Sequence, residues 1–506
     1  MKTIKMRKII YFVTSMFVLS TFWSCENLLD VSDSIIIEGE DVPKTEKDLT
    51  ALLMGSYAGM RKPLNNEWML TELRSDNSYQ YSQNTASTVN LELNDLDMYR
   101  PMTTNTLVYR YWVDVYENIK NVNLVLNYLD LVTNPVTRRQ IEGEARFIRA
   151  YHYYNLVQLY GPVPLVVKYV SANDAKKINR SPVEDVYAQI VDDLKFGAAD
   201  NYTGEDGEEI SGNLPTAYDS ENLGRITRWS AKTLLAKMYL LTKKYPEAKS
   251  LLIDIKDKSG HKLLPSFADV FSTISEMTSE TIFAIRFKAN VGGQGSPFAN
   301  RFSPASSGDK YIIGDGNSYN YPSQDFLDAV FESGDARKDI TVDAKNRFVK
   351  KYFSKVKMKD DAENDWQVLR FSDVLLMLAE VYNETEGPAN AIPLILQVRQ
   401  RAGLDTDKAT LPISSQSDCR LALERERRAE FAFENQRYYD LVRTNRLVAV
   451  LDAQFFNTER GWYSNYGAGT LGPTFATIPT EKILLPIPQK EIDTSTEFIL
   501  TQNLGY

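Results

Sequence analysis

The sequence predicts an all-α-dominated protein, in which a scaffold of paired helices carries long irregular loops that form a ligand-binding face. Three observations lead to this prediction. Helical periodicity recurs along most of the chain, and one spacing of small and aromatic residues is repeated. Two polar regions rich in Ser, Asn and Tyr interrupt the helices. The 506 residues are 43% hydrophobic and 25% charged, which is ordinary for a globular protein.

The N-terminus has the parts of a secretory signal peptide. Four basic residues precede an apolar run, residues 9–23, that is short for a membrane span, and Ser24 then precedes Cys25. This order resembles the lipobox of bacterial lipoproteins, with Phe22 where Leu is usual. The resemblance implies cleavage before Cys25 and attachment of lipid to that residue. An ordinary signal peptide with a chance cysteine is the alternative.

Charge and composition argue against several kinds of partner and cofactor. Removing residues 1–24 takes away four basic residues and no acid, which changes the net charge from −9 to −13. An acidic chain is a poor partner for nucleic acid, because phosphate binding needs a basic surface. Cys419 is the one other cysteine, so no disulfide framework is predicted. With 2 His in the chain, we expect neither a metal nor a cofactor.

The elements follow in order after an extended tether at residues 25–45. Apolar residues at helical spacing predict helices, and Thr45 and the pair Gly161-Pro162 are expected to begin the first and end the third of them. The predicted helices cover 45–62, 105–130, 137–160, 181–200 and, with breaks, 368–456. The predicted long loops cover 75–104, 201–224 and 286–323. Trp112 and Trp229 lie within helical patterns and are expected in the core.

One internal spacing repeats along the helices. Ala236 is followed by an aromatic residue, Tyr239, and then by Ala248, and Ala379, Tyr382 and Ala391 repeat both intervals. Ala150 and Tyr153 repeat the first interval alone. Small residues let two helices approach closely while the tyrosine fills the groove between them, as in tetratricopeptide (TPR) helix pairs. Generic helix packing is the alternative.

Seven segments, taken in order, resemble the SusD/RagB family of outer-membrane lipoproteins. They include GEARFIRAYHYYNLVQLYGPVPLV (143–166), LRFSDVLLMLAEVYNE (369–384) and ERERRAEFAFENQRYYDLVR (424–443), and the chain ends in QNLGY. The resemblance spans nearly the whole mature chain. Asn435 departs from it, because glycine is usual there, but asparagine also tolerates a left-handed backbone.

The resemblance implies a TPR-like superhelix of about four helix pairs and a surface-exposed lipoprotein of the outer membrane. It also implies a partner, a SusC-like TonB-dependent transporter, to which the protein delivers captured glycan. Some relatives bind peptides instead, and this alternative remains open. The implied division is a signal peptide at 1–24, a lipidated tether at 25–45, an N-terminal region at 46–285 and a C-terminal region at 286–506.

The acidic residues around Glu424 raise the alternative of a secreted glycan-active enzyme. Glycoside hydrolysis needs two carboxyl groups about 5–10 Å apart. A helix that mixes Glu with Arg instead favours ion pairs between residues four apart, such as Glu424 with Arg428, which keep the acids at low pKa. His152 and His261 lack metal-ligand spacing and are expected to be structural. The segment 314–320 lacks the closing Glu of a calcium loop and is expected to be a turn. We therefore predict a binding protein, not an enzyme.

Tyrosines and amides on the polar loops are the candidate ligand contacts. A sugar ring lies flat on an aromatic ring, while amide side chains bond its hydroxyl groups, so a glycan site needs exposed aromatics with amides beside them. Packing of these rings onto the helices is the alternative, and a purely structural TPR adaptor would leave them unexplained. The candidates are Asn77, Tyr79, Tyr81 and Asn84 in the first loop region and Tyr311, Tyr319 and Tyr321 in the second.

Overall fold

The computed structural model describes residues 42–80, 87–204, 207–405, 411–454, 477–496 and 500–506. Two units are distinguished, Met1–Val42 and Pro43–Tyr506, and the second contains the fold described below. The predicted signal peptide, Cys25 and most of the tether lie outside the described residues. The predicted division of the rest at 285/286 stays a prediction from the sequence.

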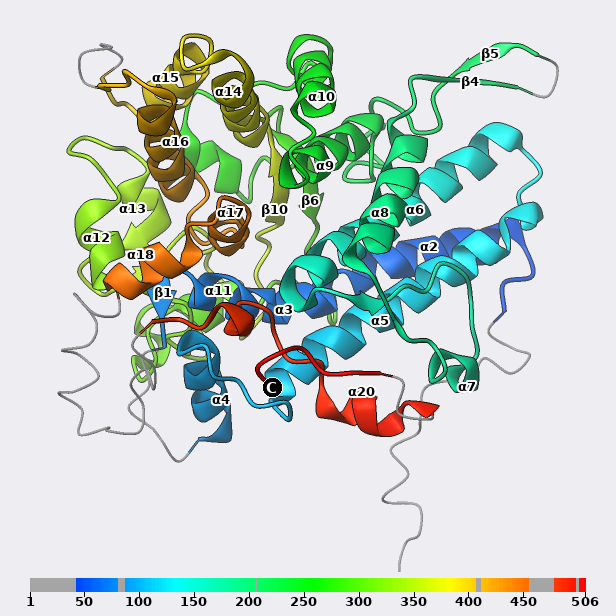
Figure 1. Ribbon diagram of the computed structural model, residues 1–506, viewed down its shortest axis with the longest axis horizontal. Coiled ribbons are helices and arrows are strands. Elements are labelled where there is room, and N and C mark those ends of the chain that lie inside the picture. Colours follow the sequence, from blue (N-terminus) through cyan, green and yellow to red (C-terminus); the bar gives the residue numbers. More distant parts are fainter. Residues whose placement is uncertain (1–41, 81–86, 205–206, 406–410, 455–476, 497–499) are drawn as a thin grey trace, which may run out of the picture. The chain divides into compact units, whose positions relative to one another are not determined.

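A continuous array of helices forms the scaffold (Figure 1). Along the array, each helix packs against the next, so the apolar face of one is covered by its neighbour. The array contains α2 (Glu46–Gly59), α5 (Thr106–Asn127), α6 (Pro135–Tyr160), α8 (Val183–Ala198), α9 (Arg228–Leu241), α10 (Tyr245–Lys258), α14 (Phe371–Glu386), α15 (Ile392–Arg401) and α16 (Gln416–Glu430). Within the described ranges, none of the helices combines the length and hydropathy needed to cross a bilayer.

The repeated spacing marks helix pairs of this array, which confirms the TPR-like fold. Ala236 and Tyr239 lie on α9 and Ala248 lies on α10, and all three are buried. Ala379 lies on α14, and Ala391 directly precedes α15; both are fully buried. The small side chains occupy the contact between paired helices, as the spacing predicts.

Local signals begin and end these helices where the sequence predicts. Thr45 caps α2 through a reciprocal capping box with Asp48. Helix α6 ends at Gly161, whose φ of 70° is a left-handed value that glycine adopts without strain. Asn435 also has a positive φ, 60°, so the substitution of asparagine for the family's glycine is accommodated. Trp112 and Trp229 are buried, as expected.

Shorter helices and two-stranded ribbons lie between the helices of the array and after them in the chain. The helices are α3 (Arg61–Leu70), α4 (Thr88–Asp97), α7 (Ala172–Ala175), α11 (Phe298–Phe302), α12 (Gln324–Ala329), α13 (Lys338–Thr341), α17 (Arg437–Arg443), α18 (Leu447–Gln454) and α20 (Gln489–Thr494). The antiparallel pairs are β1 (Ser78–Tyr79) with β7 (Tyr321–Pro322), β2 (Val163–Pro164) with β3 (Arg180–Ser181), β4 (Asn201–Thr203) with β5 (Glu209–Ser211), β6 (Thr281–Ile285) with β10 (Trp366–Arg370) and β8 (Val342–Asp343) with β9 (Phe348–Val349).

The prediction of one uninterrupted loop over 75–104 is wrong, because this region contains α4. Ser87 caps the helix by accepting a hydrogen bond from the backbone N–H of Asn90. Leu93 and Leu96 are fully buried. The polar composition hides this short apolar stripe, and packing on the scaffold supplies the stability that the local sequence lacks.

Candidate ligand-binding face

Strands β1 and β7 bring the two predicted loop regions together. Tyr79 lies opposite Tyr321 in the register, and their rings meet edge to face with centroids 5.5 Å apart. The hydroxyl of Ser323 donates to the carbonyl of Asp76, 247 positions away, at 2.9 Å. Each candidate region therefore contributes one ring to the pair Tyr79–Tyr321, and we call this pair, taken together with the separate pair Tyr319–Trp68, the tyrosine cluster.

A cation and an indole hold the tyrosine cluster in place. The guanidinium of Arg347 lies 5.8 Å from the ring centroid of Tyr79 and 5.0 Å from that of Tyr321. Tyr319 stacks on Trp68 of α3, with centroids 5.5 Å apart and planes 27° from parallel. Tyr319 and Tyr321 remain partly exposed, while Trp68 is fully buried. Tyr319 is thus supported by a residue of α3, and Tyr321 by the ring of Tyr79 and the guanidinium of Arg347.

Tyr311 contacts the two residues that flank Arg347 in the sequence. Its hydroxyl donates to Oδ1 of Asn346 at 2.9 Å, and its ring lies 5.7 Å from that of Phe348. Tyr311 is also partly exposed, so it stays a candidate. Neither Arg347 nor Trp68 was singled out from the sequence, because a lone arginine or a helical tryptophan carries no local sign of a binding site.

The expectation that Asn77 and Tyr79 are exposed is wrong. Asn77 is fully buried; its amide donates to Glu72 at 3.1 Å and accepts from Arg428 at 3.1 Å. Tyr79 is only 4% exposed. Both are covered because the β1–β7 pair packs against the scaffold instead of standing clear of it. Tyr81 and Asn84 lie outside the described residues.

The prediction of ion pairs along a single helix is also wrong. Glu424 bonds Arg446 at 2.9 Å, whereas Arg428 bonds Asp325 of α12 at 2.9 Å. One face of helix α16 is buried, so the charged side chains on that face must find partners on the elements packed against it. The pairs join α16 to the rest of the molecule instead of reinforcing the helix itself.

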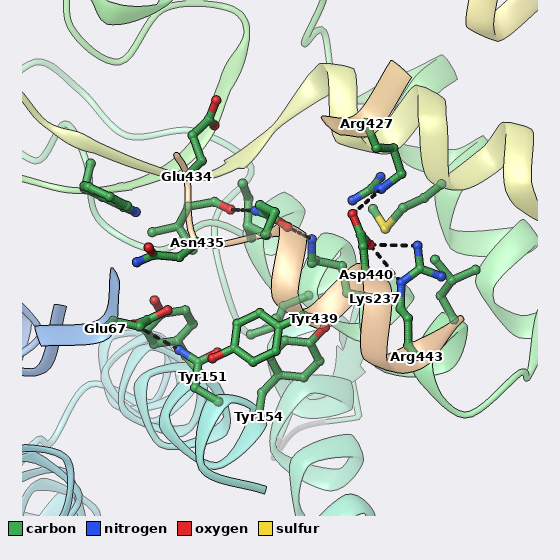
Figure 2. Close-up of a pocket in the computed structure, with 18 residues that line it drawn as sticks. Glu67, Tyr151, Tyr154, Lys237, Arg427, Glu434, Asn435, Tyr439, Asp440 and Arg443 are labelled. Atoms are coloured by element: carbon green, nitrogen blue, oxygen red, sulfur yellow. Dashed lines mark hydrogen bonds and ion pairs between the residues drawn. The ribbon is translucent and has the colours of Figure 1, made fainter. Parts of the chain in front are cut away.

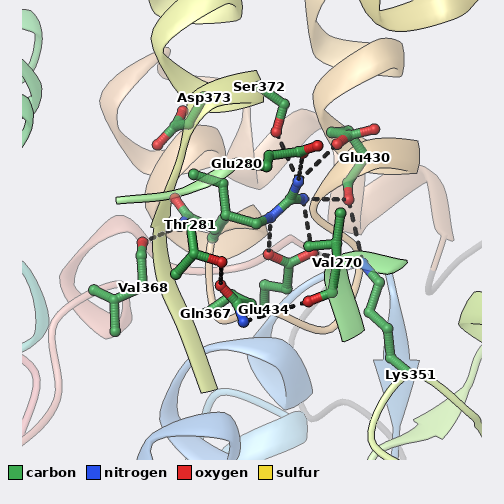
Figure 3. A network of polar contacts seen from close by, with 12 residues as sticks. Val270, Glu280, Thr281, Lys351, Gln367, Val368, Ser372, Asp373, Glu430 and Glu434 are labelled. Atoms are coloured by element: carbon green, nitrogen blue, oxygen red, sulfur yellow. Dashed lines mark hydrogen bonds and ion pairs between the residues drawn. The ribbon is translucent and has the colours of Figure 1, made fainter. Parts of the chain in front are cut away.

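A buried network of polar contacts surrounds Arg370, the residue that precedes α14 (Figure 3). Its guanidinium donates to carboxylate oxygens of Glu280, Glu430 and Glu434 at 2.8–3.0 Å. Burial alone would raise the pKa of Glu430, but Arg401, Arg370 and Arg337 hold it well below its usual range. A carboxyl group kept ionised in this way is unsuited to donate a proton in hydrolysis.

A small polar cavity of about 50 Å³ lies inside the scaffold (Figure 2). Among the described residues, the hydroxyl of Tyr439 reaches it without a hydrogen-bond partner, and the amide of Asn435 faces the carboxyl group of Glu67. Glu67, beside Asn435, is buried, which raises its pKa to about 8. The space suits a water molecule or two and excludes a sugar ring, so this cavity is not a glycan site.

The remaining candidates have structural surroundings. Nε2 of His152 lies 2.8 Å from the amide of Asn118, and burial lowers the pKa of His152 to about 3. Asp315, in the predicted turn, accepts hydrogen bonds from the backbone N–H groups of Ser306, Ser307 and Gly316. Across the described ranges, no group of three or more His, Cys, Asp or Glu side chains is placed to hold a metal ion.

Comparison with known proteins shows which family has this architecture. A family model described as "SusD family" matches residues 274–506, and one described as "Starch-binding associating with outer membrane" matches residues 27–240. The chain belongs to the SusD family. The family models thus confirm the resemblance seen in the sequence.

Relatives of the SusD family match over most of the chain. SusD-like protein P25 of Formosa agariphila is 25% identical over 99% of this chain and 100% of its own. Surface glycan-binding protein A from Bacteroides fluxus has a TM-score of 0.75 at 20% identity, covering 92% of this chain and 100% of its own. A structure titled laminarin binding SusD-like protein has a TM-score of 0.73 at 24% identity, with the same coverage. The two solved structures are named for binding laminarin or glycan, and the curated relative is named as a SusD-like protein.

Proposed function

We propose that the protein is a surface lipoprotein of the outer membrane that captures a glycan and delivers it to a SusC-like TonB-dependent transporter. The tyrosine cluster carries this proposal, because it presents partly exposed rings on a rigid support. Sugar rings stack on such surfaces. Membership of the SusD family supports it, since two relatives are named for binding laminarin or glycans.

A glycan panel tests the proposal directly. The protein is incubated with plant, fungal and algal polysaccharides and, separately, with short peptides. We expect at least one glycan to retard the protein in a native gel, with no increase in reducing ends. Release of reducing ends would mean an enzyme, and binding of peptides alone would mean a peptide importer.

Replacing the exposed rings should weaken glycan binding. Aromatic contacts contribute about 0.5–1.5 kcal/mol beyond area burial, so Tyr319→Ala and Tyr321→Ala should each weaken affinity about two- to twelve-fold. Tyr128→Ala removes a partly buried tyrosine at the end of α5 and serves as the control. Affinity and melting temperature are measured on each variant. Unchanged affinity with a melting temperature lowered as in Tyr128→Ala would show that the two rings only pack.

Cys25→Ala should release the protein from the membrane. The expected lipid is attached through the sulfur of this residue, and without it the chain lacks its anchor. Cys419→Ala is the matched control, because it removes the other cysteine, which is buried in α16. Fractionation is done in cells without the transporter. Sedimentation of Cys25→Ala with the outer membrane to the same extent as Cys419→Ala would contradict the anchor.

A further inference from the structure

A second pocket, of about 400 Å³, is lined in part by residues close in sequence to β1 and β7. Helices α16, α17 and α18 form its walls, and the segments flanking the two strands contribute Asp76 and Asp325. Its size lies in the range of small-ligand sites, unlike that of the internal cavity. Four arginines and three acids line it, and we call it the arginine pocket.

The first of its acids is neutralised within the protein. Both guanidinium donors Nε and Nη2 of Arg437 bond the carboxylate of Asp76 at 2.7 Å, and Nε of Arg428 lies 3.1 Å from it. Burial alone would raise the pKa of Asp76, but these two arginines lower it to about 2. Asp76 therefore stays ionised and paired, and it offers no net negative charge to a ligand.

The other two acids are paired as well. Asp325 accepts from Nη2 of Arg428 at 2.9 Å, and Glu424 accepts from Nε of Arg446 at 2.9 Å. Three carboxylates thus face four guanidinium groups in the pocket. One positive charge is in surplus there, although the whole chain carries a net charge of −9.

Arg425 carries the positive charge that is in surplus in the pocket. Its side chain is exposed, and in the described part of the chain its one hydrogen bond is a long contact of Nε, 3.4 Å, with the carbonyl of Leu421 in its own helix. No ion pair involves Arg425 among the described residues. Arg446, whose side chain is 41% exposed, binds Glu424 through Nε alone. Two accessible guanidinium groups therefore keep donors available.

The pocket also has an apolar wall. Ala449, Val450 and Ala453 of α18 line it opposite the charged groups of α16. Such a wall suits the C–H face of a sugar, while the planar guanidinium fork matches the oxygens of a carboxylate or sulfate group. A neutral ligand would leave the surplus positive charge of the pocket without a counter-charge.

We propose that the arginine pocket binds an anionic group, a carboxylate or a sulfate ester, on the captured glycan. This inference rests on the proposed glycan binding and adds the substrate class: an acidic polysaccharide. Asp76, which lines the pocket, lies three residues before Tyr79, and Asp325, which also lines it, lies four residues after Tyr321. In this proposal one saccharide chain stacks on the partly exposed rings and places its charged group between Arg425 and Arg446.

Matched pairs of oligosaccharides test the proposal. Tetragalacturonate is compared with its neutral methyl ester, and a sulfated galactan tetramer with its desulfated form, by calorimetry at low and moderate salt. We expect one acidic probe to bind at least about ten-fold more tightly than its neutral partner, and less tightly as salt rises. Arg425→Gln and Arg446→Gln should each remove most of this preference.

A charge-matched control separates a local effect from a general one. Lys195→Gln removes one positive charge from an exposed position of α8, far from α16 and α18 in Figure 1. It should leave the preference unchanged. Arg425 is exposed and forms no ion pair within the described ranges, so Arg425→Gln should keep the wild-type melting temperature even if Arg446→Gln does not.

The outcomes distinguish this inference from the proposed function. Equal binding of acidic and neutral partners, or a preference that both arginine variants retain, overturns the arginine pocket and leaves glycan capture standing. Binding of an acidic peptide with no glycan bound in any assay overturns both. Failure of all four tetramers to bind overturns the pocket, while the wider glycan panel still decides the proposed function.

Discussion

Arg370→Ala is expected to lower the free energy of unfolding by about 3–5 kcal/mol, the usual cost of removing one partner from a buried ion pair. Arg370 is 1% exposed and neutralises parts of three carboxylates, those of Glu280, Glu430 and Glu434. Without the guanidinium these groups stay buried with fewer partners, and the loops they hold to α14 and α16 lose their attachment.

Arg420→Ala provides the control for that experiment. Arg420 also forms a two-bond pair, with Glu384, but its side chain is 54% exposed. Exposed pairs contribute less than about 1 kcal/mol, so this variant should unfold almost as the wild type does. Both variants are compared by urea denaturation.

A lysine at the same position refines the interpretation. Arg370→Lys retains the charge but cannot reach all three carboxylates with a planar fork, so we expect a loss between those of the wild type and Arg370→Ala. Equal stability of Arg370→Ala and Arg420→Ala would contradict the structural role of the network. Loss of glycan affinity in a folded Arg370→Ala variant would place the network in ligand binding instead.

Glu67→Gln is expected to stabilise the protein at neutral pH. The pKa of Glu67 is about 8 in the folded protein against an ordinary value of 4.5, because the carboxyl group is buried. At pH 7 the folded protein holds this proton and the unfolded chain does not. Each pKa unit corresponds to about 1.4 kcal/mol, so Glu67 lowers stability at pH 7 by up to about 3 kcal/mol. Glutamine keeps the shape without that cost.

The free energy of unfolding of the wild type changes with pH in a definite direction. Between pH 4.5 and about 8, unfolding releases a proton from Glu67, so wild-type stability falls as pH rises through this window. The advantage of Glu67→Gln should therefore vanish at pH 4.5 and grow toward pH 8. Glu117→Gln, which changes a half-exposed glutamate, should show no such trend. An advantage that is constant with pH would contradict a buried, protonated Glu67.

Much of the scaffold could be predicted from local sequence. The spacing of Ala236, Tyr239 and Ala248 identified a helix pair, and the capping residue Thr45 and the glycine at 161 marked helix ends. These signals lie within one or two helical turns of the structure they specify. The sequence pattern does not predict helix α4, because its apolar stripe is too short to be recognised without the scaffold against which it packs.

The binding face was predicted only in part. Its tyrosines are predicted by residue type and loop position, and the structure places Tyr321 against Tyr79 and Tyr319 against Trp68. The sequence carried no sign that Asn77 is buried under Arg428, or that Glu424 bonds Arg446 instead of Arg428. The partners of a side chain depend on which segments of the folded chain contact one another, and amino-acid composition does not predict those contacts.

The sequence by itself therefore determined the helical scaffold, the family and the kind of residue that could touch a ligand. Only the tertiary structure decided which of those residues are exposed, and that Asp76, Asp325 and the arginines of α16–α18 share one pocket. The physical reason is the range of the interactions. Helical periodicity and capping act between residues a few positions apart, whereas the β1–β7 pair and the arginine pocket join segments separated by hundreds of positions, whose meeting depends on the packing of the whole array.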